Sequence, residues 1–312
     1  MASRLYFRFV AATGDTGSEP KAGLARRNMG RSPWAKHLRG GQSGHEAFLA
    51  IGYGAVCYLA FVVAFLYAVG FVGAIVVPRT IDRGIAAPIT EALAINVALL
   101  GVFAVQHSVM ARPGFKRWWT RIVPQSIERS TYVLLSSAAL LLLYWQWRSM
   151  PAVIWDVRQP AARLALWALF WVGWATVFAA SFMVNHFDLF GLRQVYLAWR
   201  GKPYTDIGFR TRLLYRVVRH PLMLGFFIAF WATPTMTAAH LLFAVATTGY
   251  ILIAVQLEER DLLATLGDQY RDYRRQVPML LPIPHRHSAV GPEAAGAEVA
   301  GAEVVEPGQV PG

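Results

Sequence analysis

The chain has 312 residues, of which 55% are hydrophobic and 15% are charged, and its formal net charge is +12. Soluble domains carry about 25% charged residues, so this chain lacks the polar surface that a water-soluble globule needs. Its hydrophobicity excludes a disordered chain, the lone Cys57 excludes a disulfide scaffold, and a polytopic membrane protein remains.

Stretches without a formal charge locate the predicted membrane helices. A helix needs about 20 apolar residues to cross the hydrocarbon core of a bilayer. The uncharged stretches cover residues 48–77, 92–111, 130–147, 164–187 and 220–257. The last is too long for one crossing, and Pro234 removes a helical hydrogen bond near its middle, which predicts a helical hairpin with arms at 221–233 and 238–257. We therefore expect an all-α, polytopic transmembrane helical bundle of five to six membrane helices with a C-terminal helical hairpin.

Lysine and arginine are distributed unevenly between the segments that flank these helices. Four alternate segments, 1–44, 109–130, 185–219 and 258–286, hold 25 of the 30 Lys and Arg residues. Because basic residues concentrate in cytoplasmic loops, this alternation predicts six crossings and cytoplasmic termini, in the cytoplasmic membrane of a bacterium. The positive charge is then explained by topology and by contact with the lipid bilayer, and no nucleic acid partner is expected.

The two ends of the chain differ in composition from the middle. The first residues mix Gly, Ser and Arg, and the segment from Ser288 onward is acidic, with no Lys or Arg. Neither composition buries enough apolar area to offset the entropy of ordering. The expected organisation is a disordered basic leader at 1–44, N-terminal transmembrane helices at 45–184, a cytoplasm-facing catalytic region at 185–284 and a disordered acidic tail at 285–312.

Ionisable residues gather at the end of the stretch at 164–187 and directly after it. This group comprises His186, Asp188 and Arg193. Ionisable groups at such a depth are functional candidates by default. The alternative is an ordinary interfacial cap, in which Asp188 pairs with Arg193 and His186 anchors at the headgroups.

A predicted anion-binding helix start precedes the hairpin. Proline is favoured at the first position of a helix, where its missing N–H needs no partner, so the first arm is predicted to begin at Pro221. Arg219 and His220 come directly before it, and the free N–H groups there favour an anion. Gly225, one turn in, lets another backbone or a flat ligand approach closely. The alternative is a capped helix with a snorkelling arginine.

Charged residues follow the second arm of the hairpin. Glu258 and Glu259 open a run of charges, and two acids at the lip of a membrane cavity suit a cationic group. Further on, Tyr270 and Tyr273 lie one helical turn apart and share a helix face. That face is predicted either to pack on lipid or to form a lid over a cofactor.

Together these residues carry a resemblance to a known family. The chain contains Arg-His-Pro-x-x-x-Gly at 219–225, Glu-Glu at 258–259 and Gly-x-x-Tyr-x-x-Tyr-x-x-x-Val-Pro at 267–278. From about Phe48 to Pro284 it resembles the isoprenylcysteine carboxyl methyltransferase superfamily, whose members are integral membrane enzymes that use S-adenosyl-L-methionine. The resemblance implies a cofactor pocket formed by Tyr215, His220, Pro221, Leu222, Met223 and Glu258, the last of which would hold the amino group of the cofactor. We add Gly225, from the helix start, and Tyr273, from the tyrosine face, to the residues expected to bind the cofactor.

Three longer strings, at 185–194, 200–205 and 230–237, narrow the resemblance. They are similar to a branch of the superfamily that methylates methanethiol, a small volatile thiol, to dimethyl sulfide. Prenylcysteine enzymes have an arginine four residues before the cofactor-binding glutamate, where it meets the substrate carboxylate. This chain has Ala254 there, which suits an acceptor without a carboxylate. Met223 also departs from the pattern, because an aromatic residue is common at that position.

The implied reaction transfers a methyl group from a sulfonium to the acceptor by in-line displacement. Positioning of the two reactants therefore supplies much of the catalysis. The attacking sulfur must be a thiolate, and thiols have a reference pKa of about 8.5. We therefore expect His186 and Asp188 to remove the proton, and Arg193 or Arg219 to stabilise the negative charge. A thiol that partitions into lipid would meet a charged cytosolic cofactor at the cytoplasmic edge of the membrane.

Other functions share parts of this pattern. The acceptor could be another lipophilic thiol or a carboxylate. An NADPH-dependent reductase also carries Arg-His-Pro at a helix start, but its usual Trp-x-x-Tyr-Cys element is absent from residues 270–274. A non-enzymatic carrier places polar residues mid-membrane, where this chain offers only isolated ones such as Asn96. No metal is expected, because His285 and His287 form only a weak ligand pair. The sequence gives no oligomeric state.

Overall fold

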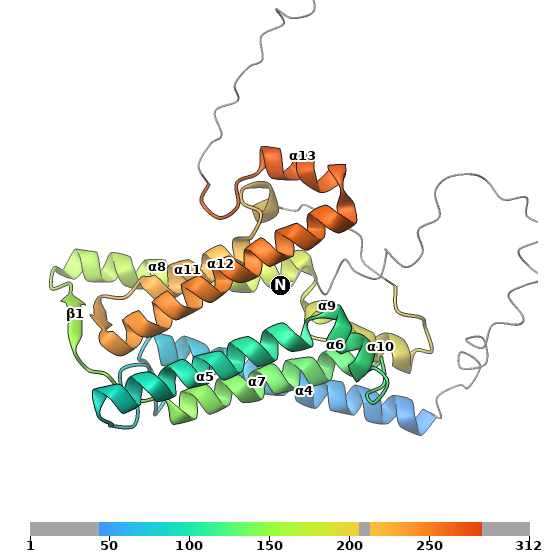
Figure 1. The fold of residues 1–312 in the computed structure, drawn as a ribbon, viewed down its shortest axis with the longest axis horizontal. Coiled ribbons are helices and arrows are strands. Elements are labelled where there is room, and N and C mark those ends of the chain that lie inside the picture. Colours follow the sequence, from blue (N-terminus) through green and yellow to red (C-terminus); the bar gives the residue numbers. More distant parts are fainter. Residues whose placement is uncertain (1–43, 206–212, 283–312) are drawn as a thin grey trace, which may run out of the picture. The chain divides into compact units, whose positions relative to one another are not determined.

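The computed structural model describes residues 44–205 and 213–282, and within them the chain is almost entirely helical (Figure 1). The predicted all-α class is therefore confirmed. The expected leader and tail, with His285 and His287, lie outside the described residues, apart from Gly44, where the first described helix begins. The elements in chain order are α4 (Gly44–Val72), α5 (Ile89–Met110), α6 (Pro113–Trp119), α7 (Glu128–Gln146), β1 (Val153–Asp156), α8 (Pro160–Val184), α9 (His186–Leu189), α10 (Leu192–Trp199), the 3-10 helix η3 (Leu213–Arg216), α11 (Pro221–Trp231), β2 (Thr235–Thr237), α12 (Ala238–Leu266) and α13 (Asp268–Gln276).

Four of the described helices, α4, α5, α8 and α12, are long and apolar enough to cross a membrane. The chain is therefore an integral, multi-pass membrane protein. α11 is a shorter apolar helix of 11 residues, and α7 has 19 residues with Glu128 and Arg129 at its start. Neither of these two is among the four, so the expected six crossings stay a prediction.

α7 is covered by other helices instead of facing outward on all sides. It packs against α4 on one side and α5 on the other. Polar residues lie on its buried surface, among them Ser130, Ser136 and Ser137. Ser137 Oγ donates to the carbonyl of Val133 over 2.8 Å, one turn earlier, so its hydroxyl is satisfied within the helix. Burial of these polar groups between helices explains why α7 is less apolar than its neighbours.

The predicted helical hairpin is present, and its turn also holds a short strand. After α11 ends, β2 pairs antiparallel with β1, a pairing that the hydropathy pattern did not predict. Thr237 then starts α12, because its hydroxyl accepts a hydrogen bond from the backbone N–H of His240 at 3.1 Å.

The second arm of the hairpin is longer than expected. α12 continues to Leu266 instead of ending near Leu257, so Glu258 and Glu259 lie inside the helix and do not follow it. Glutamate, arginine and leucine are good helix formers, which lets the helix continue beyond the apolar stretch. The charged run is therefore part of α12, where both glutamates are less than 5% exposed and Arg260 faces outward.

α8 and α11 pack closely because glycines face each other at their interface. A Cβ atom on Gly225 would lie 2.7 Å from the carbonyl oxygen of Gly173, and one on Gly173 would lie 2.6 Å from the backbone nitrogen of Ala229. Small residues let helix backbones approach in this way inside membranes. The close approach expected at Gly225 is therefore present, and it is to the backbone of α8; a place for Gly225 in the cofactor site stays a prediction.

Aromatic side chains fill the core at the end of the bundle that carries β1 and β2. Phe71, Trp147 and Phe243 are buried and contact one another edge to face. Trp147 also donates from its indole N–H to the carbonyl of Ile81 over 3.0 Å, which ties the loop after α4 to the end of α7. This end is closed by packing.

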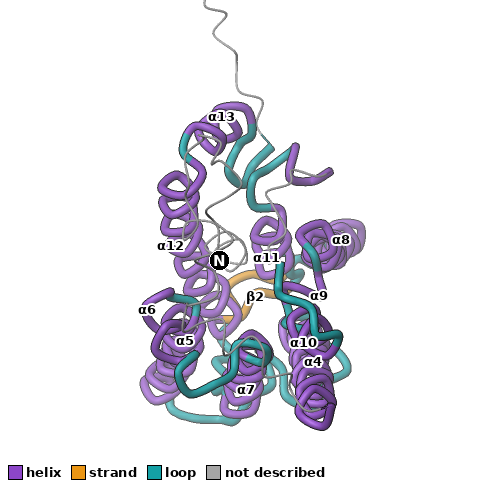
Figure 2. Tube along the Cα trace, turned by 90° about the vertical axis from the view of Figure 1, so that its right-hand side faces the viewer, coloured by secondary structure: helices purple, strands orange, loops and turns teal. Residues whose placement is uncertain are grey.

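The short helices lie at the opposite end of the long ones. Figure 1 shows α6, α9 and α10 beside the ends of α5, α7 and α4, with α13 following the end of α12. Figure 2 looks at the molecule from that side. This end holds most of the buried charged residues, among them Arg129, Asp188, Arg219 and Glu259.

Candidate functional site

The first polar cluster joins the segment before α11 to the last turns of α12. Arg219 donates from Nε to Glu259 Oε1 over 2.7 Å, and Nε2 of His220 lies 3.1 Å from the same oxygen. All three side chains are buried. We call these three residues the Glu259 cluster. The distant stretches around His220 and Glu258 therefore come together as expected, but the acid that bonds His220 is Glu259.

Backbone groups of the segment after α13 complete the cluster. The Nη1 atom of Arg219 donates to the carbonyls of Arg274 and Val277, at 3.0 and 2.5 Å. The backbone N–H groups of Arg219 and His220 donate to the carbonyls of Pro278 and Met279, at 2.8 and 3.1 Å. Arg219 is thus engaged in holding three segments together, in addition to the charge-stabilising role that the sequence predicts for it.

His220 is neutral at physiological pH. Burial lowers its pKa below the ordinary value of 6.5, and the hydrogen bond with Glu259 opposes only part of that shift. A neutral imidazole beside a carboxylate must present N–H toward it, so Nε2 donates to Glu259. His220 thereby positions the start of α11 against α12.

The two tyrosines of α13 pack on protein, not on lipid. Tyr270 is 1% exposed and contacts Leu262 of α12. Tyr273 donates from its hydroxyl to the carbonyl of Tyr215 over 2.6 Å. Burial raises the pKa of Tyr273 to about 12 and also raises the pKa of Tyr215, so both phenols stay protonated. α13 is therefore fastened over the segment before α11, as a lid would be.

The residues expected to hold the cofactor offer a negative group, the Glu258 carboxylate, and a partly positive one, the N-terminus of α11. Glu258 is 1% exposed and precedes Glu259 on α12. The contact between Glu259 and His220 holds the start of α11 against this part of α12. α11 begins with Pro221 at its first position, and Leu222 and Met223 follow in the first turn, where N–H groups have no helical partner. A carboxylate and a helix N-terminus suit the amino and carboxylate groups of an amino-acid moiety. The donor set thus fits S-adenosyl-L-methionine.

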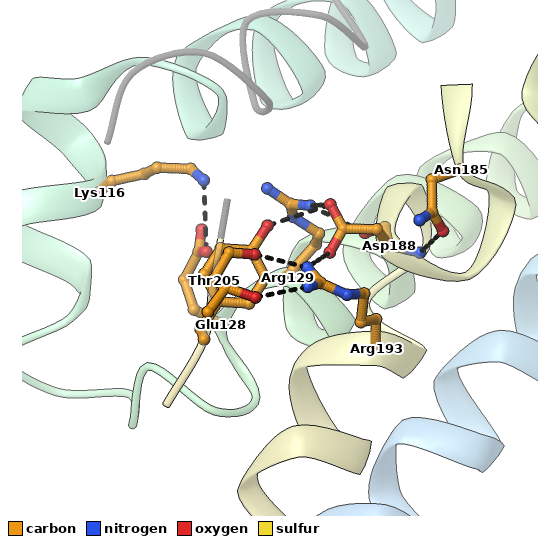
Figure 3. Close-up of polar contacts among 8 residues, drawn as sticks. Lys116, Glu128, Arg129, Asn185, Asp188, Arg193 and Thr205 are labelled. Atoms are coloured by element: carbon orange, nitrogen blue, oxygen red, sulfur yellow. Dashed lines mark hydrogen bonds and ion pairs between the residues drawn. The ribbon is translucent and has the colours of Figure 1, made fainter. Parts of the chain in front are cut away.

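The second polar cluster surrounds Asp188 on α9 (Figure 3). Arg129 of α7 donates from Nη1 to Asp188 Oδ2 over 2.9 Å and to the Asp188 carbonyl over 2.8 Å. Arg193 donates to Oδ1 over 3.2 Å, and the Tyr204 hydroxyl donates to Oδ2 over 3.0 Å. We call these four residues the Asp188 cluster. The expected Asp188–Arg193 pair is present, but it is only one part of a larger network.

Arg129 and Tyr204 are the members of this cluster that sequence reasoning missed. Arg129 looks like one of the basic residues that flank a membrane helix, yet its side chain is 3% exposed. The available signal was a basic residue directly at the start of the predicted stretch 130–147, next to Glu128. Lys116 lies beside this pair, 3.3 Å from Glu128 Oε2, and burial lowers its pKa.

The turn before α9 sets the direction of Asp188. Asn185 has a φ of 134°, which few residues other than glycine adopt, and its side-chain oxygen accepts the backbone N–H of Asp188 at 3.1 Å. α9 is thereby separated from α8 although the two are adjacent in sequence. Asparagine tolerates a positive φ, and its side chain also caps the start of the short helix α9.

His186 is buried among aromatic rings and bonded at both nitrogens. The Ser181 hydroxyl donates to the carbonyl of Phe178 over 2.7 Å, so its oxygen accepts from His186 Nδ1–H over 2.9 Å. Nε2 therefore accepts from the Tyr58 hydroxyl, 2.8 Å away. The ring of Phe182 stacks on the imidazole at a centroid distance of 4.3 Å. Burial lowers the pKa of His186, which keeps it neutral.

The sequence of this chain is similar to those of several known proteins. The NnrU protein family matches residues 95–258. The methanethiol S-methyltransferase of Mycobacterium tuberculosis is 76% identical over 78% of this chain and 100% of its own length. Methanethiol S-methyltransferase 2 of Bradyrhizobium diazoefficiens is 58% identical over 74% of this chain and 88% of its own. Nurim of Rattus norvegicus is 33% identical over 58% of this chain and 70% of its own length. No solved structure matches.

Proposed function

This chain belongs to the methanethiol S-methyltransferase family and to the wider NnrU protein family, and from that premise we propose that it methylates the sulfur of methanethiol. The product is dimethyl sulfide and the methyl donor is S-adenosyl-L-methionine. The observation that supports this most strongly is the match to the mycobacterial relative along its entire length at 76% identity.

The methyl donor is proposed to bind where α11 starts beside α12. When bound, S-adenosyl-L-methionine would supply a methyl group on a positively charged sulfur, which the acceptor thiolate would take while the donor leaves as a neutral thioether. Glu258 would hold the amino group, and the first turn of α11, with Leu222 and Met223, would face the carboxylate. The Glu259 cluster holds these two elements together, so its residues position the site without contacting the methyl group.

The residue at position 254 supports a thiol acceptor over a carboxylate acceptor. Ala254 precedes Glu258 by one helical turn on α12, so the two share a helix face. The prenylcysteine enzymes that the chain resembles have an arginine at this position, where it meets the substrate carboxylate. Alanine supplies no such partner from this position, which favours an acceptor that is small and carries no carboxylate.

Removal of the thiol proton by His186 or Asp188 stays a prediction from the sequence. Both carboxylate oxygens of Asp188 already accept hydrogen bonds from Arg129, Arg193 and Tyr204. His186 has one nitrogen lone pair, and Tyr58 donates to it. These contacts favour a positioning role, in which both residues fix α9 against α7 and α4.

The reaction is proposed to take place at the cytoplasmic edge of the membrane. Both polar clusters lie at the end of the long helices that carries α6, α9, α10 and α13 (Figure 1). The described segments at that end, 109–130, 185–205, 213–219 and 258–282, hold 14 of the 19 Lys and Arg residues of the described chain. Basic residues favour the cytoplasmic side. A lipid-soluble thiol and a water-soluble methyl donor both reach that edge.

The proposal is tested by headspace gas analysis of cells that express the chain and are fed methanethiol. We expect dimethyl sulfide from the wild type and a loss of at least about tenfold in Glu258→Gln, because the neutral amide gives up a charge-assisted hydrogen bond. Glu91→Gln is the matched control, since Glu91 is an exposed glutamate at the start of α5. No dimethyl sulfide above background from membrane-inserted wild type would overturn the proposal.

A further inference from the structure

A small cavity lies between the C-terminal end of α5 and the second half of α12. Its volume is about 40 Å³, and it is lined by Ser108, Ala111, Arg112, Tyr250, Ile253, Ala254 and Leu257. We propose that this cavity binds the thiol acceptor as its thiolate. The inference rests on the proposed function and deepens it, because the resemblance directs only position 254 toward the acceptor, and the cavity adds Ser108, Arg112 and Tyr250 as groups that would hold the sulfur.

The size of the cavity suits a very small ligand. One water molecule needs about 10–15 Å³ on the same measure, so a cavity of 40 Å³, open on the side of the exposed Arg112 and Ile253, has room for a ligand of two or three heavy atoms. Methanethiol has one carbon and one sulfur. Four of the lining side chains, those of Ala111, Ile253, Ala254 and Leu257, are apolar and match its methyl group.

The polar lining is concentrated on one side and suits an anionic sulfur. The hydroxyl oxygens of Ser108 and Tyr250 lie 3.1 Å apart and link α5 to α12. Hydroxyl groups reorient freely, so both O–H bonds can turn toward a ligand atom that accepts them. Arg112 adds a permanent positive charge, because a guanidinium stays protonated at all physiological pH values.

This lining explains how a thiolate forms without a base in the cavity. None of the seven lining residues is a carboxylate or an imidazole. A positive charge and two O–H donors favour the thiolate over the thiol, which shifts the ionisation toward the anion. The thiol proton passes to water on the side where Arg112 is exposed. A sulfur lone pair then forms the new bond to the methyl carbon as the bond from that carbon to the sulfonium breaks, and the donor leaves as a neutral thioether.

The position of the cavity on α12 places the acceptor next to the proposed donor site. Tyr250, Ile253, Ala254 and Leu257 form a stripe along one face of the helix, at the spacing that aligns side chains. Glu258 continues that stripe by one position, four residues after Ala254. A sulfur in the cavity would therefore lie along the same helix face as the group proposed to hold the methyl donor.

The first test measures binding without turnover. Saturation-transfer NMR with isotope-labelled methanethiol, on purified protein without methyl donor, should show saturable binding that Ala254→Leu abolishes. Ala264→Leu is the matched control, because Ala264 is exposed on the same helix, and it should bind as the wild type does. Saturable binding that survives Ala254→Leu, or no saturable binding to the wild type, would overturn the proposal.

The second test separates acceptor binding from chemistry. Ala254→Val should raise the KM for methanethiol by about tenfold or more, as one or two extra carbons in such a pocket do, with the affinity for S-adenosyl-L-methionine unchanged. Ser108→Ala combined with Tyr250→Phe should raise KM most at low pH, where thiolate is scarce. Equal effects on donor affinity would contradict the assignment. Binding of methanethiol without any dimethyl sulfide would instead refute the proposed function and leave the cavity as a thiol site.

Discussion

At the scale of single residues, the Asp188 carboxylate is the group whose environment the structure defines most fully. It is 1% exposed, and its partner Arg129 is 3% exposed. Removing one member of a buried ion pair costs about 3–5 kcal/mol, because the other charge is left uncompensated. Asp188→Asn should therefore lower the stability of the detergent-solubilised protein by an amount in that range.

Thermal unfolding of purified variants checks this prediction. Asp156→Asn is the control, because Asp156 pairs with Arg163 where both side chains are about 40% exposed. Such surface pairs contribute about 0–1 kcal/mol. Equal losses in the two variants would show that the Asp188 cluster does not stabilise the fold.

His220 gives a prediction about pH. Its pKa is lowered in the folded protein by burial, so between that value and the unfolded value of about 6.5 the unfolded chain binds more protons. Stability contributed by neutral His220 is therefore complete above about pH 6.5 and is lost as the pH falls below it. His220→Gln should flatten the fall in melting temperature between about pH 7 and about pH 5. A slope identical to that of the wild type would contradict this assignment.

His186 tests whether the predicted base or the proposed positioning role is correct. With both nitrogens engaged by Ser181 and Tyr58, His186→Gln should lower thermal stability and leave the shape of the pH–rate profile unchanged. If His186 instead takes the thiol proton, the rate loss should be confined to low pH and should vanish above the thiol pKa of about 8.5. The pH–rate profile of the variant separates the two.

Sequence reasoning located the two polar segments and the Asp188–Arg193 pair, but not the other contacts within them. The motif residues His220, Glu258 and Asp188 were singled out because their types and spacing are unusual at a membrane boundary. Which of two adjacent glutamates bonds His220 depends on the rotation of α12, and that rotation is set by packing against α11 and α13. Arg129 could not be assigned as a partner of Asp188 for the same reason, since the contact joins residues 59 positions apart.

At the scale of helices, the glycine contact between α8 and α11 gives the clearest prediction. Gly225→Ala places a Cβ 2.7 Å from a backbone oxygen that cannot move away without shifting α8. Overpacking of this kind costs about 1–3 kcal/mol. Gly249→Ala on α12 meets nothing within 4 Å and should be neutral or stabilising, because alanine favours helix by roughly 0.5–1 kcal/mol. Melting temperatures of the two variants should therefore move in opposite directions or differ clearly.

The helices themselves were predictable because charge-free length is a strong signal in a membrane protein. The stretches at 48–77, 92–111 and 164–187 overlap α4, α5 and α8. The β1–β2 pairing was not predictable, because each strand is short and its partner lies far away in the chain. The end of α12 was missed because the hydropathy pattern stops where the apolar residues stop, although the backbone hydrogen bonds continue into the buried charged turns.

At the scale of the whole molecule, the proposed orientation predicts which loops are reached from which side. With Cys57→Ser as background, a single cysteine at Arg158, whose side chain is 90% exposed in the loop before α8, should react with a membrane-impermeant thiol reagent outside intact cells. A cysteine at Asp272 on α13, 63% exposed, should react only after lysis. The reverse pattern would place the polar clusters on the outer side.

The contacts of Arg219 also have a consequence for biosynthesis. The Val277 carbonyl that accepts from its guanidinium lies 58 residues further along the chain. A chain that ends after α12 lacks this acceptor and also α13, so the Glu259 cluster stays incomplete until residues beyond α12 have been added. Such a chain would carry every long apolar helix of the described residues without the contacts that hold the start of α11.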